Sequence, residues 1–263
     1  MSTVFKYRNW SNDYHKKSLL EGNIFMAPPG SFNDPFDCKI PMNYHLLDTE
    51  DKKNEYADAV IARNRLLIDS SQSKSELDRK KLLERLNDLD KLQSEHEELE
   101  FSAYNNHFGV FSLSHRWDSI LMWSHYADNH RGFVIGYNLE KLKGSDIFAQ
   151  GGPVSYVDEF PNMDPITDSA KFESSIVQLF SKAKDWQYEE EYRLVNLFYP
   201  QIPSNDDRNI KLPIDFIDEV VIGLDINNND KTSIFAFCQE RSISLFKIIK
   251  TPFMYSLARE RLL

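Results

Sequence analysis

The sequence predicts an α+β fold in which a single domain, residues 1–263, carries a helical hairpin inserted at residues 46–100. Of the 263 residues, 41% are hydrophobic and 13% aromatic, which is enough apolar material for a substantial core. Short alternating segments bounded by turn-forming residues predict strands on both sides of the insert. The insert itself contains neither Gly nor Pro and is rich in charged helix formers.

The first 45 residues predict a strand, a helix and a second strand. Ser11 or Asn12 is placed to cap the helix, which runs to Glu21 and is stopped by Gly22. The two strands cover residues 4–8 and 23–27. After them, Asn33-Asp34-Pro35 predicts an ordered loop, because Asn and Asp before Pro favour turns. Burial of Phe32 and Phe36 is expected to anchor that loop.

Leucines in the insert recur at steps of four, three and three residues, which gives a narrow apolar stripe: Leu82, Leu86, Leu89 and Leu92. We expect two helices, over 50–69 and 75–100, joined by a turn in the polar cluster Ser70–Ser75. Such a hairpin can be an arm that contacts a protein partner, or an insert packed on its own domain. The second interpretation is favoured.

Residues 101–263 return to a mixed composition and predict alternating strands and helices. The expected strands cover residues 108–114, 132–137, 154–157, 189–197, 219–223 and 243–249. The expected helices cover residues 119–128, 170–184 and 230–241.

Charge and cysteine content exclude several classes of protein. The formal net charge of −10 argues against broad nucleic-acid binding, which depends on neutralising phosphates. Cys38 and Cys238 can form neither a disulfide framework nor a four-thiolate metal site. The N-terminus has no apolar signal segment, and no stretch is long enough for a membrane span. We therefore expect a cytoplasmic protein with no membrane association.

The most charged predicted strand contains Glu189, Glu191 and Arg193, whose side chains share one face by alternation. Two crowded carboxylates beside an arginine are a plausible catalytic pair, because crowding raises one pKa and the arginine opposes this. The alternative is a salt-bridged strand edge.

Two other segments carry candidate polar side chains. Ser112 and Ser114 share one strand face and can hold a ribose or an amide, but there is no Gly-x-Ser-x-Gly elbow of a serine hydrolase. His125 and His130 are five positions apart, a spacing that does not predict a zinc site on a helix. His125 is a candidate wall residue, whereas the spacing of Trp123 from Tyr126 favours the core.

Five motifs cover nearly the whole chain apart from the insert: Phe32–Asp37, Ser112–Ser114, Leu121–Ala127 with Gly132, Trp186–Arg193 and Glu219–Gly223. Together they resemble the bacterial family catalogued as domain of unknown function 2971. Some relatives resemble abortive-infection (phage-resistance) proteins. The resemblance therefore implies a defence role.

A more distant resemblance is to ADP-ribosyltransferases of the arginine–serine–glutamate class. Arg8, Ser112-x-Ser114 and Glu189-x-Glu191 occur in the order of that class. The resemblance implies an ADP-ribosyltransferase-like mixed β core that uses NAD as a substrate. Cleavage of the nicotinamide–ribose bond develops oxocarbenium character, which a carboxylate such as Glu191 would stabilise. Glu189 would orient the acceptor or a water molecule.

The same resemblance implies roles for the remaining candidate residues. Arg8 would pair with a phosphate of NAD, and Ser112 or Ser114 would position the ribose. Tyr188 or Trp123 would face the nicotinamide ring. The wall of the cleft would include two more side chains, His125 and Asn33.

Three functions are thus weighed from the sequence. The first is an NAD-using ADP-ribosyltransferase-like enzyme, a transferase or NAD glycohydrolase, in a toxin or phage-defence effector whose acceptor macromolecule is unknown. The second is a non-catalytic binding or sensing module, marked by salt bridges that tie Glu189 and Glu191 to Arg193 or Lys184. The third is a metal-dependent nuclease, which requires three carboxylates within about 5 Å of one another: Asp34, Asp37 and Glu189.

Overall fold

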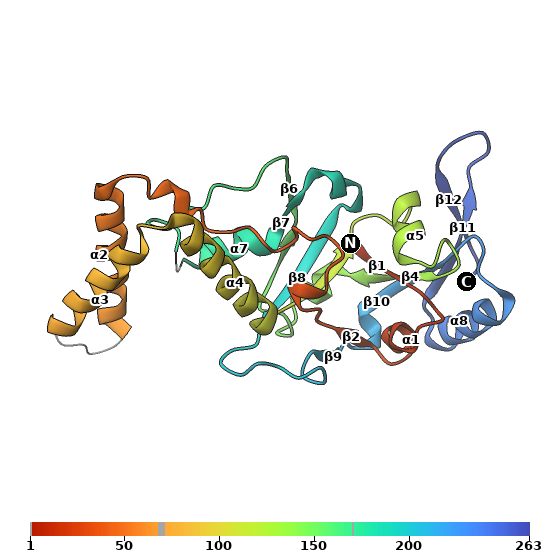
Figure 1. The fold of residues 1–263 in the computed structure, drawn as a ribbon. Coiled ribbons are helices and arrows are strands. Elements are labelled where there is room, and N and C mark those ends of the chain that lie inside the picture. Colours follow the sequence, from red (N-terminus) through yellow and green to blue (C-terminus); the bar gives the residue numbers. More distant parts are fainter. Residues whose placement is uncertain (1, 68–71, 170) are drawn as a thin grey trace.

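The computed structural model describes residues 2–67, 72–169 and 171–263, and its centre is an eight-stranded mixed sheet (Figure 1). In sheet order the strands are β12 (Leu257–Arg261), β11 (Ser244–Lys250), β10 (Ile217–Ile222), β4 (Phe133–Asn138), β1 (Thr3–Arg8), β3 (Phe108–Ser114), β8 (Glu191–Leu197) and β5 (Gln150–Pro153). β10 and β11 run parallel and are joined by α8 (Asn228–Arg241), while the other neighbours in this order are antiparallel. The predicted α+β fold class is confirmed.

Short two-stranded sheets and further helices surround the large sheet. β2 (Asn23–Phe25) pairs antiparallel with β9 (Asn209–Lys211), and β6 (Ser155–Val157) pairs parallel with β7 (Ser181–Ala183). The helices next to the sheet are α1 (Asp13–Leu20), α5 (Ile120–Tyr126), α6 (Leu139–Lys143) and α7 (Phe172–Phe180). No helix in the described ranges is both long and apolar enough to cross a membrane.

The two faces of the large sheet bury separate apolar clusters, because side chains alternate along each strand. On β1, Val4 belongs to the cluster that includes Ile234 of α8. Phe5 and Tyr7 belong to the cluster on the opposite face, with Trp123 of α5. Full burial of such a side chain contributes about 1.5–3 kcal/mol. The two helices therefore cover opposite faces of the sheet, and β1 lies between two cores.

The predicted N-terminal elements are present. Asn12 caps α1: its side-chain oxygen accepts hydrogen bonds from the backbone N–H groups of Tyr14 (2.9 Å) and His15 (3.3 Å). Gly22 follows the helix with a φ of 76°, a left-handed conformation that favours glycine. A Cβ at residue 22 would lie 2.2 Å from the backbone oxygen of Leu212, so this close approach also requires glycine.

The insert lies beyond one end of the sheet (Figure 1), and its described part forms α2 (Glu50–Leu67), α3 (Gln72–Arg85) and α4 (Leu89–His107). The sequence predicted one helix over 75–100, but the chain turns between α3 and α4. The turn is stabilised by burial of Leu86 and by Asp88, whose carboxylate caps α4 at the N–H of Lys91. Of the turn predicted at Ser70–Ser75, residues 70 and 71 lie outside the described ranges, and α3 begins at Gln72.

The insert has an apolar cluster of its own, which includes Tyr44, Leu47, Tyr56, Leu86, Leu92 and Met163. None of these buried residues belongs to the clusters described for the sheet. The side-chain amide of Gln93 on α4 accepts from the backbone N–H of Tyr44 and donates to the oxygen of Met42, both at 2.8 Å. The insert is therefore packed against the segment that precedes it.

Two predicted elements near the charged motif have different bounds in the structure. Within the predicted helix 170–184, residue 170 lies outside the described ranges, and α7 ends at Phe180, after which the chain pairs as β7 with β6. The predicted strand 189–197 begins at Glu191, because residues 184–189 form a 3-10 helix and Glu190 is left-handed with a φ of 42°. The local sequence pattern did not reveal that β7 pairs with β6, because this pairing joins distant segments of the chain.

Candidate active site

The central sheet opens between β1 and β3, and a cleft lies along this opening. β1 pairs with β4 along its whole length, from Thr3 to Arg8, whereas its register with β3 consists of the pair Phe5↔Ser114. Away from that pair the two strands diverge, and residues of both line a cleft of about 1140 Å³. Because the cleft passes between strands, residues from both faces of β1 contribute to it.

Most of the site residues predicted from the sequence line this cleft. Arg8 comes from β1, Ser112 from β3 and Glu191 from β8, which are neighbouring strands in the sheet order. Three further predicted residues also line it: Asn33, His125 and Glu189. The topology therefore brings together side chains that the sequence separates widely.

Ser114, Trp123 and Tyr188 lie outside the lining of the cleft. Ser114 is fully buried, and its hydroxyl donates to the backbone oxygen of Glu189 and accepts from the N–H of Arg116. Trp123 is fully buried in the core beneath α5, so it cannot stack on a ligand ring. Tyr188 is half-buried, packs against that same core and has its ring centroid 6.4 Å from that of His125, which lines the cleft. The predicted contacts of Ser114 and Trp123 with NAD are corrected, because both side chains are fully buried and support the wall of the cleft from behind.

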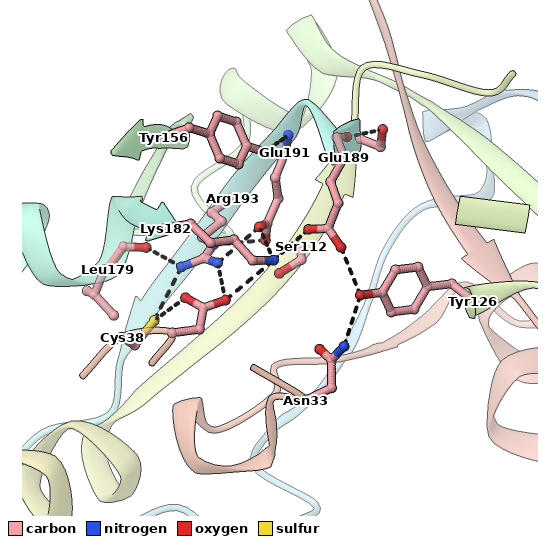
Figure 2. A network of polar contacts seen from close by, with 12 residues as sticks. Asn33, Cys38, Ser112, Tyr126, Tyr156, Leu179, Lys182, Glu189, Glu191 and Arg193 are labelled. Atoms are coloured by element: carbon pink, nitrogen blue, oxygen red, sulfur yellow. Dashed lines mark hydrogen bonds and ion pairs between the residues drawn. The ribbon is translucent and has the colours of Figure 1, made fainter. Parts of the chain in front are cut away.

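A buried ion-pair network forms the floor of the cleft at β8 (Figure 2). The Nε of Arg193 donates to Oε1 of Glu191 at 2.8 Å, and its Nη2 donates to Oε2 of Glu191 at 3.0 Å. The same Nη2 donates to Oδ2 of Asp37 at 2.7 Å, and Nη1 donates to the backbone oxygen of Leu179 at 2.6 Å. Arg193 has no exposed surface, so it holds both carboxylates in fixed positions.

Lys182 joins all three carboxylates of the network. Its Nζ lies 2.5 Å from Oε2 of Glu189, 3.2 Å from Oε2 of Glu191 and 3.5 Å from Oδ2 of Asp37. With Arg193, the network has three carboxylates and two cations. Glu189, Glu191, Asp37 and Lys182 all line the cleft.

Tyr126 and Asn33 extend this network across the cleft (Figure 2). The hydroxyl of Tyr126 donates to Oε1 of Glu189 at 2.8 Å, and Nδ2 of Asn33 donates to the Tyr126 oxygen at 3.3 Å. Tyr126 therefore orients Glu189 from the α5 side, although the sequence had favoured it as a core residue. Phe32 anchors the loop as predicted, because its ring is partly buried against the cluster that includes Val110, whereas Phe36 is 59% exposed, contrary to the prediction.

The two glutamates have opposite pKa shifts. Burial alone would raise the pKa of Glu191, but Arg193 and Lys182 outweigh it and lower the value to about 2. Burial raises the pKa of Glu189, against the attraction of Lys182. Carboxylates whose environments separate their pKa values are suited to different roles in one reaction. Glu191 is the permanently ionised group, and Glu189 is the better proton acceptor.

Cations occupy another part of the cleft. Burial and the neighbouring Arg8 lower the pKa of Lys6 to about 7, while burial lowers that of Arg8 to about 10. The Nζ of Lys6 donates to the backbone oxygen of Ser112 at 2.6 Å. The buried Nε of Arg8 has no hydrogen-bond partner among the described residues. Such desolvated cations favour an anionic ligand.

Three important residues were missed in the sequence for different reasons. Lys6 was detectable, because it lies two residues before Arg8 on a predicted strand and so shares its face. Tyr126 lies in the motif Leu121–Ala127, but its role as a hydrogen-bond donor depends on Glu189 across the cleft. Lys182 had no local signal, since it was placed in a predicted helix and reaches the carboxylates only because residues 181–183 form β7.

The three carboxylates that the sequence offered as metal ligands, Asp34, Asp37 and Glu189, have other partners in the structure. Asp37 and Glu189 bind the ammonium of Lys182, which holds the position between them. Oδ1 of Asp34 instead accepts from the backbone N–H of Phe36 at 2.9 Å. The described part of the chain contains no group of three His, Cys, Asp or Glu residues placed to hold a metal ion.

The fold and this cleft define an α+β protein with a charged cleft between two diverging central strands. Residues 122–194 match the family model described as protein of unknown function (DUF2971), which supports the first resemblance seen in the sequence. The matched segment runs from α5 to β8 and contains both glutamates of the cleft. The searches of curated proteins and of solved structures yielded no match.

Proposed function

We propose that this cleft binds NAD as a substrate and that the protein is an ADP-ribosyltransferase-like enzyme, either a transferase or an NAD glycohydrolase. The observation that carries the proposal is the convergence of Arg8, Ser112 and Glu191 from three neighbouring strands on one cleft. The opening between β1 and β3 supplies the space for an extended ligand.

The cationic part of the cleft fits the pyrophosphate of NAD. Arg8 has a buried Nε without a partner among the described residues, and Lys6 lies beside it. Charge-assisted hydrogen bonds to phosphate oxygens would satisfy these donors and offset their desolvation. Ser112 links Lys6 to Glu191: its backbone oxygen accepts from Lys6, and its hydroxyl donates to Glu191.

The anionic part of the cleft fits the reacting ribose. As the bond between nicotinamide nitrogen and ribose C1′ breaks, its electron pair leaves with nicotinamide and positive charge develops on the ribose. The carboxylate of Glu191 would stabilise that charge, since its lowered pKa keeps it ionised. The acceptor, a nucleophilic side chain or water, bonds to C1′ and loses its proton to Glu189, whose raised pKa favours this role.

A non-catalytic nucleotide-binding module is the second candidate function. It is favoured by the bidentate ion pair, because both oxygens of Glu191 are already held by Arg193. An engaged carboxylate still acts electrostatically, but it has less freedom to bond a ribose hydroxyl. Both candidate functions therefore require nucleotide binding, but only the enzyme would turn NAD over.

The biological setting that we propose is a toxin or phage-defence effector. Its support is the resemblance of some relatives to abortive-infection proteins. Depletion of cellular NAD would be the expected consequence of such an activity. Expression in bacteria should therefore lower NAD and arrest growth, and the Glu189→Gln variant should do neither.

Release of nicotinamide from NAD tests the enzymatic proposal. Purified protein should release nicotinamide, alone or with cell extract as the source of acceptor. Glu189→Gln should slow release by about a hundred-fold or more, as expected for loss of a group that acts in the transition state. Glu190→Gln is the matched control, because Glu190 is exposed and outside the cleft lining. NAD binding without turnover would support the binding module, and no binding would contradict both candidates.

A further inference from the structure

A second region of the cleft, away from the glutamates, has exposed aromatic side chains. Tyr14 on α1 is 77% exposed and Phe25 on β2 is 37% exposed, and both line the cleft. Figure 1 shows α1, β2 and β9 close together beside the large sheet. We call Tyr14, Phe25 and Asn209 the aromatic rim.

The register of β2 and β9 explains how the rim is assembled. Phe25 lies directly opposite Asn209, so their side chains share one face of this small sheet. Asn209 also lines the cleft, and its Nδ2 donates to the backbone oxygen of Asn205 at 2.9 Å. This bond orients the amide, whose Oδ1 is an acceptor suited to an exocyclic amino group. When a planar ring stacks on the aromatic side chains, that oxygen can accept a hydrogen bond from an amino group on the edge of the ring.

The rim is held in place by a buried arginine in the turn before β9. Nη1 of Arg208 donates to the backbone oxygen of Phe108 at 2.7 Å, and Nη2 donates to those of Asn105 and Asn106 at 3.1 and 3.0 Å. The N–H of Met26 in turn donates to the oxygen of Arg208 at 2.9 Å. A binding surface fixed in this way loses little conformational entropy when a ligand binds.

Hydrogen bonds show the order of groups along the cleft. The Nζ of Lys6 donates to the backbone oxygen of Ser112 on β3, the strand next to β8 with its glutamate. At the other end of β1, Arg8 is followed by Asn9, whose N–H donates to Nδ1 of His15 at 3.1 Å, and His15 follows Tyr14 on α1. The sequence of groups is therefore carboxylates, then cations, then the aromatic rim. This order matches a ligand that has a sugar at one end, phosphates in the middle and a base at the other end.

We infer that the aromatic rim is a subsite for a purine base with an exocyclic amino group, of the adenine type, at the end of the ligand remote from the glutamates. The inference rests on the proposed function for the identity of the whole ligand. It adds that Tyr14 and Phe25 stack on the base while Asn209 accepts from its amino group. This subsite for the base is separate from the contact with the nicotinamide ring that the sequence analysis expected of Tyr188 or Trp123.

Binding of ADP and of inorganic pyrophosphate to the full chain tests the subsite. Tyr14→Ala should weaken ADP binding by about ten-fold or more, whereas Tyr14→Phe should keep it, because the stacking face is retained. Pyrophosphate binding should be unchanged in Tyr14→Ala, since that probe has no base. Tyr255→Ala is the matched control, because Tyr255 is fully exposed on the β11–β12 hairpin and outside the cleft lining. Tyr14 is itself exposed, so its removal leaves the fold intact.

The outcomes separate this subsite from the proposed reaction. Selective loss of ADP affinity in Tyr14→Ala supports the subsite, even where wild-type protein releases no nicotinamide. Equal affinity of wild type and Tyr14→Ala for ADP overturns the subsite, even where NAD is consumed. Inosine diphosphate lacks the amino group, so it should bind to wild type more weakly than ADP does. In Asn209→Ala, which lacks the acceptor, the two nucleotides should bind with equal affinity. Wild-type protein that binds neither ADP nor pyrophosphate contradicts the subsite and the proposed function together.

Discussion

Glu191 and Arg193, two residues apart on β8, form a bidentate ion pair with bonds of 2.8 and 3.0 Å, and Arg193 has no exposed surface. Side chains at positions i and i+2 of a strand share a face, so the spacing itself makes the pair feasible. The same glutamate is the proposed stabiliser of the reacting ribose. The carboxylate of Glu191 therefore has both a structural role, in the ion pair with Arg193, and a proposed chemical role.

Glu191→Gln should reduce the stability of the fold as well as any activity. The amide cannot neutralise Arg193, and breaking a buried ion pair by removing one partner costs about 3–5 kcal/mol. For a chain of this size the melting temperature should fall by roughly 6–20 °C. Calorimetry measures this, with the exposed Glu190→Gln as control. An unchanged melting temperature would show that the ion pair contributes no net stability.

Stability should also fall in acid because of Glu191. Its pKa in the fold is about 2, below the usual 4.5, so the ionised form contributes stability that is present above pH 4.5. This contribution, about 3 kcal/mol, is lost as the pH falls from 4.5 towards 2. Urea unfolding at several pH values should show a smaller slope in this window for Glu191→Gln. Identical slopes would contradict the lowered pKa.

Binding of ADP-ribose, whose phosphates stay ionised near neutrality, should weaken as the pH rises above about 7. The anion binds the ammonium form of Lys6, whose pKa is lowered to about 7, so at higher pH binding must take up a proton. Affinity should fall by up to ten-fold per pH unit. Titrations of Lys6→Arg should be flat over pH 6–9, because guanidinium remains charged. A wild-type profile that is equally flat would remove Lys6 from the phosphate site.

Tyr126→Phe should shift the acid limb of the pH–rate profile to higher pH. The hydrogen bond from Tyr126 favours ionised Glu189, so its loss raises the already elevated pKa of that carboxyl. A reaction that needs Glu189 as a base then requires more alkaline conditions. Nicotinamide release measured from pH 5 to 9 checks this. Tyr156→Phe is a control, since Tyr156 accepts a bond from the backbone of Glu191 and does not line the cleft.

Replacing residues 50–100 by a flexible linker should keep the cooperative unfolding of the remaining chain. The buried clusters of the sheet share no residue with the cluster of the insert, and none of the described residues between 50 and 100 lines the cleft. The melting temperature should fall, because Tyr44 and Leu47 lose their apolar neighbours. Thermal unfolding followed by circular dichroism, together with ADP binding, measures both effects. A broad, non-cooperative transition would show that the sheet depends on the insert.

Local features of the sequence determined most of the elements around the cleft. Alternation predicted β1 and β3, and the cap at Asn12 and the stop at Gly22 predicted α1. These features depend on neighbouring residues, whose periodicity and capping chemistry are visible in the sequence. The order of Arg8, the Ser-x-Ser motif and the Glu-x-Glu motif was likewise readable before their positions in space were known.

Only the tertiary structure decided which of those side chains meet and what surrounds them. Arg193 binds Asp37 across 156 positions of the chain, and Lys182 reaches the glutamates because β7 pairs with β6. Ser114, a candidate ribose contact in the sequence, is fully buried and supports the wall of the cleft, as does Trp123, whose spacing already favoured the core. Burial, ion pairing and the opening between β1 and β3 depend on contacts between distant segments, and a periodic pattern has no information about them.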